Sequence, residues 1–208
     1  MNFREFKKCA ASGLENARRT LSILTGRDVT INSQSMGFVE LGDIPALSGS
    51  PEDVVLASYV TFDGDARGQL MILFKPDSAE KLVSVLSPHL TSHVDPKDMS
   101  RLLDSTVSEV ANIVGSSVLN AIADGARMTL KPSPPILIRE MSGAILESVV
   151  ATCSRGADRV YVVDIKFSAG EGKALFEIVF LPDICTNSSG FWIMGALHGP
   201  TVDSCKTF

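Results

Sequence analysis

Residues 95–124 have the sequence DPKDMSRLLDSTVSEVANIVGSSVLNAIAD, in which apolar residues recur at intervals of three and four. This spacing is typical of an amphipathic α-helix. Asp95 is a favourable N-cap and Pro96 is favoured at the first helical position, so the helix is expected to begin there. Gly125 follows the segment and is expected to end it. One side of the helix forms an ordinary apolar core face, made of Leu103, Val107, Val110, Val114, Val118 and Ile122.

The opposite side of this helix carries a row of polar residues with a single charge. We call it the polar row; its members, spaced four, three, four and four residues apart, are Ser105, Glu109, Asn112, Ser116 and Asn120. A solvated helix face more often carries paired Lys and Glu, and Ser and Asn are mediocre helix formers. Because neutral polar groups cost less to desolvate than charged ones, the row suits a surface that another protein covers. The spacing alone leaves an ordinary solvated face as the alternative.

The order of elements around this helix occurs twice in the chain. A first helix is predicted at Phe3–Gly26, and it is followed by strands and a predicted hairpin, as is the helix at 95–124. The two hairpins end alike, with FKPD at 74–77 and FLPD at 180–183. This repeat indicates one domain over residues 1–208 made of two similar halves, about 1–94 and 95–197, with a C-terminal tail.

The predicted fold class is therefore α+β (layered α/β), with the helices and the sheet in separate layers. A central, mainly antiparallel sheet is expected, with two long helices packed side by side on one face. The two halves are expected to be related by a pseudo-twofold axis.

The composition excludes several classes of function. The chain is 45% apolar and 21% charged, with a net charge of −5 and no block of Lys and Arg. It therefore lacks the basic footprint of a nucleic-acid or membrane-surface protein. Its apolar runs are too short to span a bilayer, and no apolar region of a signal peptide follows the first charged residues. We expect a cytoplasmic protein without membrane insertion.

The cysteines and histidines do not have the spacing of a metal site or a disulfide framework, so we expect neither. They are Cys9, Cys153, Cys185, Cys205, His89, His93 and His198.

Four residues resemble the signature of a known family. Ser105, Glu109, Asn112 and Pro135 follow the pattern of the CheC/CheX/FliY chemotaxis phosphatases: Ser or Asp, three residues, Glu, two residues, Asn, about twenty-two residues, Pro. The segment SEVANIVG at 108–115 is also similar to the family's helix. The resemblance extends to about Leu197 and is closest to CheC in length and layout.

The resemblance implies hydrolysis of the aspartyl phosphate of a CheY-like response regulator. Glu109 and Asn112 would be the catalytic residues, with Ser105 and Pro135 in support. No cofactor of its own is expected, because the bound response regulator supplies Mg²⁺. For Ser105 the alternative is a hydroxyl bonded back to a helix carbonyl, and Pro135 or the neighbouring Pro134 is expected mainly to shape the strand entry.

The first helix departs from the two-site pattern of the family. The alignment of the helices places Arg4, Lys8 and Ala11 where Ser or Asp, Glu and Asn belong. We therefore expect one working site, in the second half of the chain.

The sequence leaves two other functions open. One is a binding module of the chemotaxis or flagellar-switch network, for CheD or phosphorylated CheY, with weak or partner-dependent activity. The other is a small-molecule sensor, which would need a closed apolar pocket with a few convergent polar groups.

Overall fold

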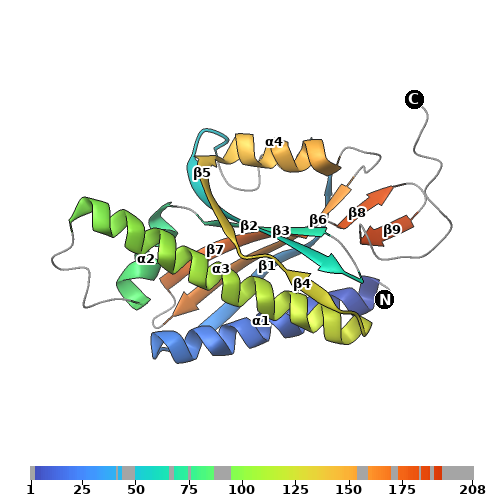
Figure 1. The fold of residues 1–208 in the computed structure, drawn as a ribbon, viewed down its shortest axis with the longest axis horizontal. Coiled ribbons are helices and arrows are strands. Elements are labelled where there is room, and N and C mark those ends of the chain that lie inside the picture. Colours follow the sequence, from blue (N-terminus) through green and yellow to red (C-terminus); the bar gives the residue numbers. More distant parts are fainter. Residues whose placement is uncertain are drawn as a thin grey trace.

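A computed structural model gives the fold, and a central antiparallel sheet organises it (Figure 1). The structure describes residues 3–40, 42–43, 50–65, 68–74, 76–86, 95–153, 159–169, 173–182, 184–187 and 190–193. Its helices are α1 (Phe3–Thr25), α2 (Pro76–Leu86), α3 (Pro96–Ala126) and α4 (Ser142–Cys153). Its strands are β1 (Val29–Glu40), β2 (Val54–Gly64), β3 (Gly68–Phe74), β4 (Leu130–Pro132), β5 (Ile136–Met141), β6 (Arg159–Ala169), β7 (Lys173–Pro182), β8 (Ile184–Asn187) and β9 (Gly190–Ile193).

The strand pairings are antiparallel and cross between the two parts of the chain. The hairpins β2–β3 and β6–β7 lie next to each other through the pair β3–β7. The strand β1 from the first part pairs with β6, whereas β4 and β5 from the second part both pair with β2. The α+β class with a mainly antiparallel sheet is therefore confirmed, while the origin of the fold by duplication stays a prediction.

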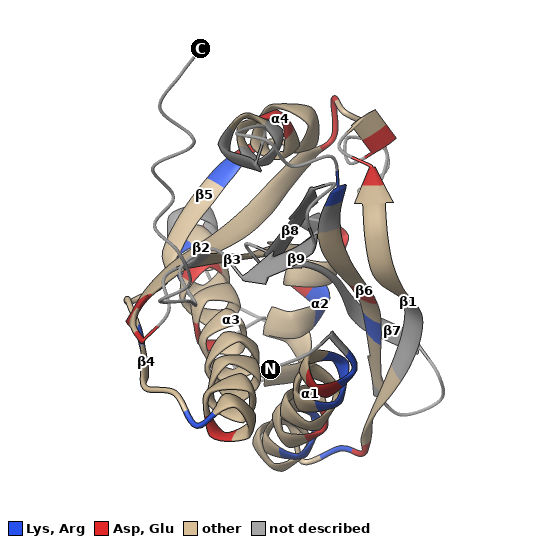
Figure 2. Cartoon of the chain, turned by 90° about the vertical axis from the view of Figure 1, so that its right-hand side faces the viewer, with Lys and Arg blue, Asp and Glu red and all other residues tan. Residues whose placement is uncertain are grey.

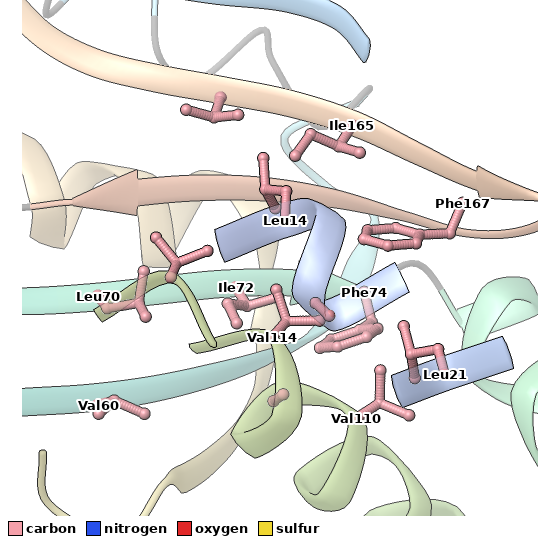
Figure 3. Packing of buried hydrophobic residues seen from close by; sticks show 14 of the residues in the cluster. Leu14, Leu21, Val60, Leu70, Ile72, Phe74, Val110, Val114, Ile165 and Phe167 are labelled. Carbon is pink, nitrogen blue, oxygen red and sulfur yellow. The ribbon is translucent and has the colours of Figure 1, made fainter. Parts of the chain in front are cut away.

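The two long helices lie side by side on one face of the sheet, and α4 lies on the other (Figure 1). Their apolar sides meet the sheet, where Leu21 of α1 and Val110 of α3 pack near Phe74 of β3 (Figure 3). The predicted core face of α3 is buried along its whole length. This burial turns the polar row away from the core.

The helices α1 and α3 cross closely at a glycine. A Cβ atom added at Gly13 would lie 2.5 Å from the Cα of Val118 and 2.7 Å from the backbone oxygen of Ser117. A separation of this kind is too short for any side chain, so only glycine allows the two backbones to approach at this crossing.

The end of α3 differs from the prediction. The helix continues through Gly125 to Ala126, and Arg127 adopts a positive φ of 55° immediately after it. A Cβ at Gly125 would collide with the thiol of Cys9 on α1. The glycine is thus present for helix packing, and the prediction that it ends the helix was wrong because the left-handed position falls two residues later.

Candidate functional site

The polar row forms an exposed face of α3. Ser105, Glu109, Asn112 and Asn120 are exposed and Ser116 is half-buried. In Figure 2 most of α3 is drawn without charge, whereas α1 carries several basic and acidic residues. Across the described ranges, no hydrogen bond or ion pair engages the carboxylate of Glu109 or the side-chain amide of Asn112. Both groups are therefore available to a partner.

The serines of the row have different surroundings. The hydroxyl of Ser116 donates a hydrogen bond to the backbone oxygen of Asn112 one turn earlier. Ser116 thus has the back-bonded geometry that was the alternative for Ser105. Ser105 itself makes no hydrogen bond to any residue that the structure describes, and its side chain lines a hollow beside the row.

The proline of the signature lies in a break of the edge strand. Pro134 is exposed and Pro135 is half-buried, and both separate β4 from β5, which pair with the same neighbour β2. The backbone N–H of Ser133 donates to Thr61 O at 2.7 Å, and its hydroxyl accepts from Thr61 N at 3.1 Å. Proline has no N–H to donate to a strand ladder, so within a sheet it is restricted to places such as this break in an edge strand. Pro135 therefore lies where it can shape the edge strand beside α3.

A hollow of about 360 Å³ adjoins the row between α3 and the strands β2 and β5. Its polar wall contains an ion pair between Arg139 Nη2 and Asp104 Oδ1 at 3.2 Å. The lining is Leu56, Asp104, Ser105, Ser108, Leu137 and Arg139. This hollow is open and has both polar and apolar walls, so it is not the closed apolar pocket that a small-molecule sensor requires.

The first helix presents a different surface. Arg4, Lys8 and Ala11 are all exposed on α1, as the alignment of the two helices requires, but they bring no carboxylate and no amide. Farther along, Arg18 binds Glu15 at 2.8 Å and the backbone oxygen of Val29 at 2.9 Å. The hydrogen bond from Arg18 lowers the pKa of the Glu15 carboxyl. These charges attach α1 to β1 and have a structural role.

The described residues contain neither a metal-binding group of side chains nor a membrane-spanning helix. Within them, no group of three or more His, Cys, Asp or Glu could hold a metal ion. None of the helices described is long and apolar enough to cross a membrane.

Comparisons with known proteins agree with the fold and with the resemblance to chemotaxis phosphatases. The family "Chemotaxis phosphatase CheX" matches residues 56–155. The chain is 22% identical over 186 residues to the CheY-P phosphatase CheC of Bacillus subtilis (strain 168), which covers 88% of this chain and 89% of that protein.

Solved structures with the same fold include FliY of Thermotoga maritima, with a TM-score of 0.62, 14% identity and coverage of 86% of this chain and 90% of FliY. Another is the CheX–CheY–BeF3–Mg²⁺ complex from Borrelia burgdorferi, with a TM-score of 0.54, 16% identity and coverage of 83% of this chain and 96% of the matched chain. These comparisons show that the chain is similar in sequence to the CheC and CheX chemotaxis phosphatases and shares its fold with CheX and FliY.

Proposed function

We propose that this protein hydrolyses the aspartyl phosphate of a CheY-like response regulator, with Glu109 and Asn112 of α3 as its working site. The observation that carries the proposal is the pair itself. A carboxylate and an amide lie three residues apart on the exposed face of a helix, and neither makes a hydrogen bond or ion pair with a described residue. The similarity to the B. subtilis protein supports this proposal, because that relative is named a CheY-P phosphatase.

The reaction requires positioning more than acid–base chemistry. A water oxygen bonds to phosphorus, the bond from phosphorus to the aspartyl oxygen breaks, and the carboxylate leaves with the bonding electrons. The products are the free aspartate and inorganic phosphate. An acyl phosphate is already activated, so the catalyst must mainly hold the water in line with the leaving oxygen.

Asn112 has the side chain for this task. Its amide carries both a donor and an acceptor, remains neutral at all relevant pH values and needs no shifted pKa. The amide oxygen would accept a hydrogen bond from the attacking water and so direct the water's lone pair at phosphorus. The response regulator would supply Mg²⁺ to neutralise charge on the phosphoryl oxygens, so this chain needs no cofactor of its own.

Glu109 lies one turn before Asn112 and can fix the position along α3 at which the response regulator docks. Its carboxylate would pair with the lysine that lies near the phosphate of the response regulator, through a charge-assisted hydrogen bond. With Glu109 held in this way, the next turn of α3 would bring Asn112 to the phosphoryl group.

The direct test is the decay of a phosphorylated CheY-like response regulator from the same organism, measured with Mg²⁺ in the presence and absence of this protein. We expect faster release of phosphate with catalytic amounts of the protein. If none of the organism's CheY-like regulators loses phosphate faster, the proposal fails and the protein is a binding module.

The Glu109→Ala variant is expected to raise the KM for the phosphorylated regulator about tenfold, because an ion pair with the partner is lost. The difference from wild type should grow at low ionic strength, where screening is weaker. Steady-state rates at two salt concentrations measure both effects. The matched control is Glu147→Ala, an exposed glutamate of α4 on the other face of the sheet. An equal KM for the two variants would contradict the role of Glu109.

The Lys8→Ala variant tests the expectation of a single site. Lys8 is exposed on α1 and offers no carboxylate. Its replacement should leave the dephosphorylation rate unchanged within about twofold, which corresponds to about 0.4 kcal/mol in the barrier. A tenfold loss of rate would show that α1 takes part in the reaction.

A further inference from the structure

The hollow beside the polar row is built from three elements: α3, β2 and β5. From α3 it is lined by Asp104, Ser105 and Ser108, and from the sheet by Leu56 of β2 together with Leu137 and Arg139 of β5. Leu56 and Arg139 are direct partners in the antiparallel ladder, so their side chains lie on one face of the sheet. That face is the one against which α3 packs.

An exposed apolar pair continues the floor of the hollow. Val54 and Met141 are partners in the same ladder, two residues beyond Leu56 and Arg139, and therefore lie on the same face. The two residues remain 47% and 46% exposed. Leu56 is itself buried, so the apolar surface open to an occupant is that of Leu137, Val54 and Met141. This surface favours an apolar occupant beside the polar wall, because its burial is a source of favourable free energy.

The hollow lies close enough to Glu109 and Asn112 to fall inside an interface with the response regulator. A stable protein–protein contact buries about 800 Å² on each partner, which is the area of a disc with a radius of about 16 Å. At 1.5 Å per residue, Ser105 lies about 6 Å from Glu109 and about 10 Å from Asn112 along α3. A response regulator whose phosphoaspartate meets Asn112 would thus extend over Ser105 and the hollow.

We infer that the hollow receives an apolar side chain of the response regulator and that its lining helps to select which regulator is dephosphorylated. This inference rests on the proposed function and names the partner surface of the same site. The ion pair between Arg139 and Asp104 spans from β5 to α3 and forms the polar wall of the hollow. Glu109 and Asn112 recognise the phosphoryl group and the lysine that phosphorylated response regulators share. The hollow recognises a side chain that differs from one response regulator to another.

The test fills the hollow and measures binding. Ser108→Phe places a benzyl group in the hollow from α3 without changing Glu109 or Asn112, and the matched control Ser148→Phe lies on α4 across the sheet. The probe is the organism's CheY-like regulator treated with beryllofluoride and Mg²⁺, titrated against each variant. We expect the Kd to rise at least tenfold for Ser108→Phe and to change less than twofold for Ser148→Phe.

A second pair of variants tests the inference in case Ser108→Phe misfolds. Met141→Asp changes the exposed extension of the hollow, whereas Ile136→Asp changes an exposed residue of the same strand that points to the opposite face. We expect Met141→Asp to raise the Kd at least fivefold and Ile136→Asp to leave it within twofold. Unchanged affinity of a folded Ser108→Phe or Met141→Asp variant overturns the inference, as does the absence of saturable binding to wild type.

The outcomes separate this inference from the proposed function. The titration needs no turnover, so it tests the hollow even if wild type fails to accelerate phosphate release. If wild type accelerates release and Ser108→Phe has an unchanged Kd, the phosphatase proposal stands and the inference about the hollow falls. A change of oligomeric state in Ser108→Phe without a change in Kd assigns the hollow to a second copy of this chain and also overturns it.

Discussion

The Asn112→Ala variant is expected to dephosphorylate the response regulator about 10² to 10³ times more slowly than wild type at saturating substrate. The removed amide is the group that would hold the attacking water, and the loss of one such positioned polar group costs about 3–4 kcal/mol in the barrier. The affinity for the beryllofluoride-treated regulator should change little, because Glu109 and the surrounding surface remain. Single-turnover phosphate release and equilibrium titration measure the two quantities separately.

Asn120→Ala is the matched control for this experiment. Asn120 is an exposed asparagine on the same polar row, two turns farther along α3. We expect Asn120→Ala to retain the wild-type rate. The free energy of unfolding of both variants should lie within about 1 kcal/mol of the wild-type value, because both positions are exposed. The site assignment is rejected if a folded Asn112→Ala variant keeps the wild-type rate, or if Asn120→Ala loses as much.

The Gly13→Ala variant is expected to lower the free energy of unfolding by about 3 kcal/mol. The new Cβ would lie 2.5 Å from the Cα of Val118, so α1 and α3 must move apart along a shared apolar face. Overpacking of this kind typically costs 1–3 kcal/mol, and here the obstacle is backbone and not a flexible side chain. Urea denaturation of wild type and variant measures the difference.

Gly37→Ala provides the comparison for that prediction. Gly37 lies in β1, and a Cβ added there would meet no atom within 4 Å. Its replacement should change the free energy of unfolding by less than about 0.5 kcal/mol. Similar stability of the two variants would show that the helices do not cross as closely as described.

The sequence by itself determined the two faces of α3. Because the side chains of a helix repeat every 3.6 residues, their spacing states which residues share a side without any knowledge of the neighbours. The side with Val107, Val110 and Val114 is fully buried, and the side with Glu109 and Asn112 is exposed. The same local reasoning predicted both long helices and the two hairpins, since caps, turns and periodicity are local signals, although it ended α3 two residues too early.

Only the tertiary structure decided which elements meet. Strand patterns state the faces of a strand but not its partner, so the pairing of β1 with β6 and of β5 with β2 had no local signal. The roles of Gly13 and Gly125 depend on a second helix about a hundred residues away, which spacing within one helix cannot reveal. The hollow has the same origin: Ser105 and Ser108 join Leu56 and Arg139 only because β5 lies beside β2 under α3, and such long-range contacts arise from packing of the whole core.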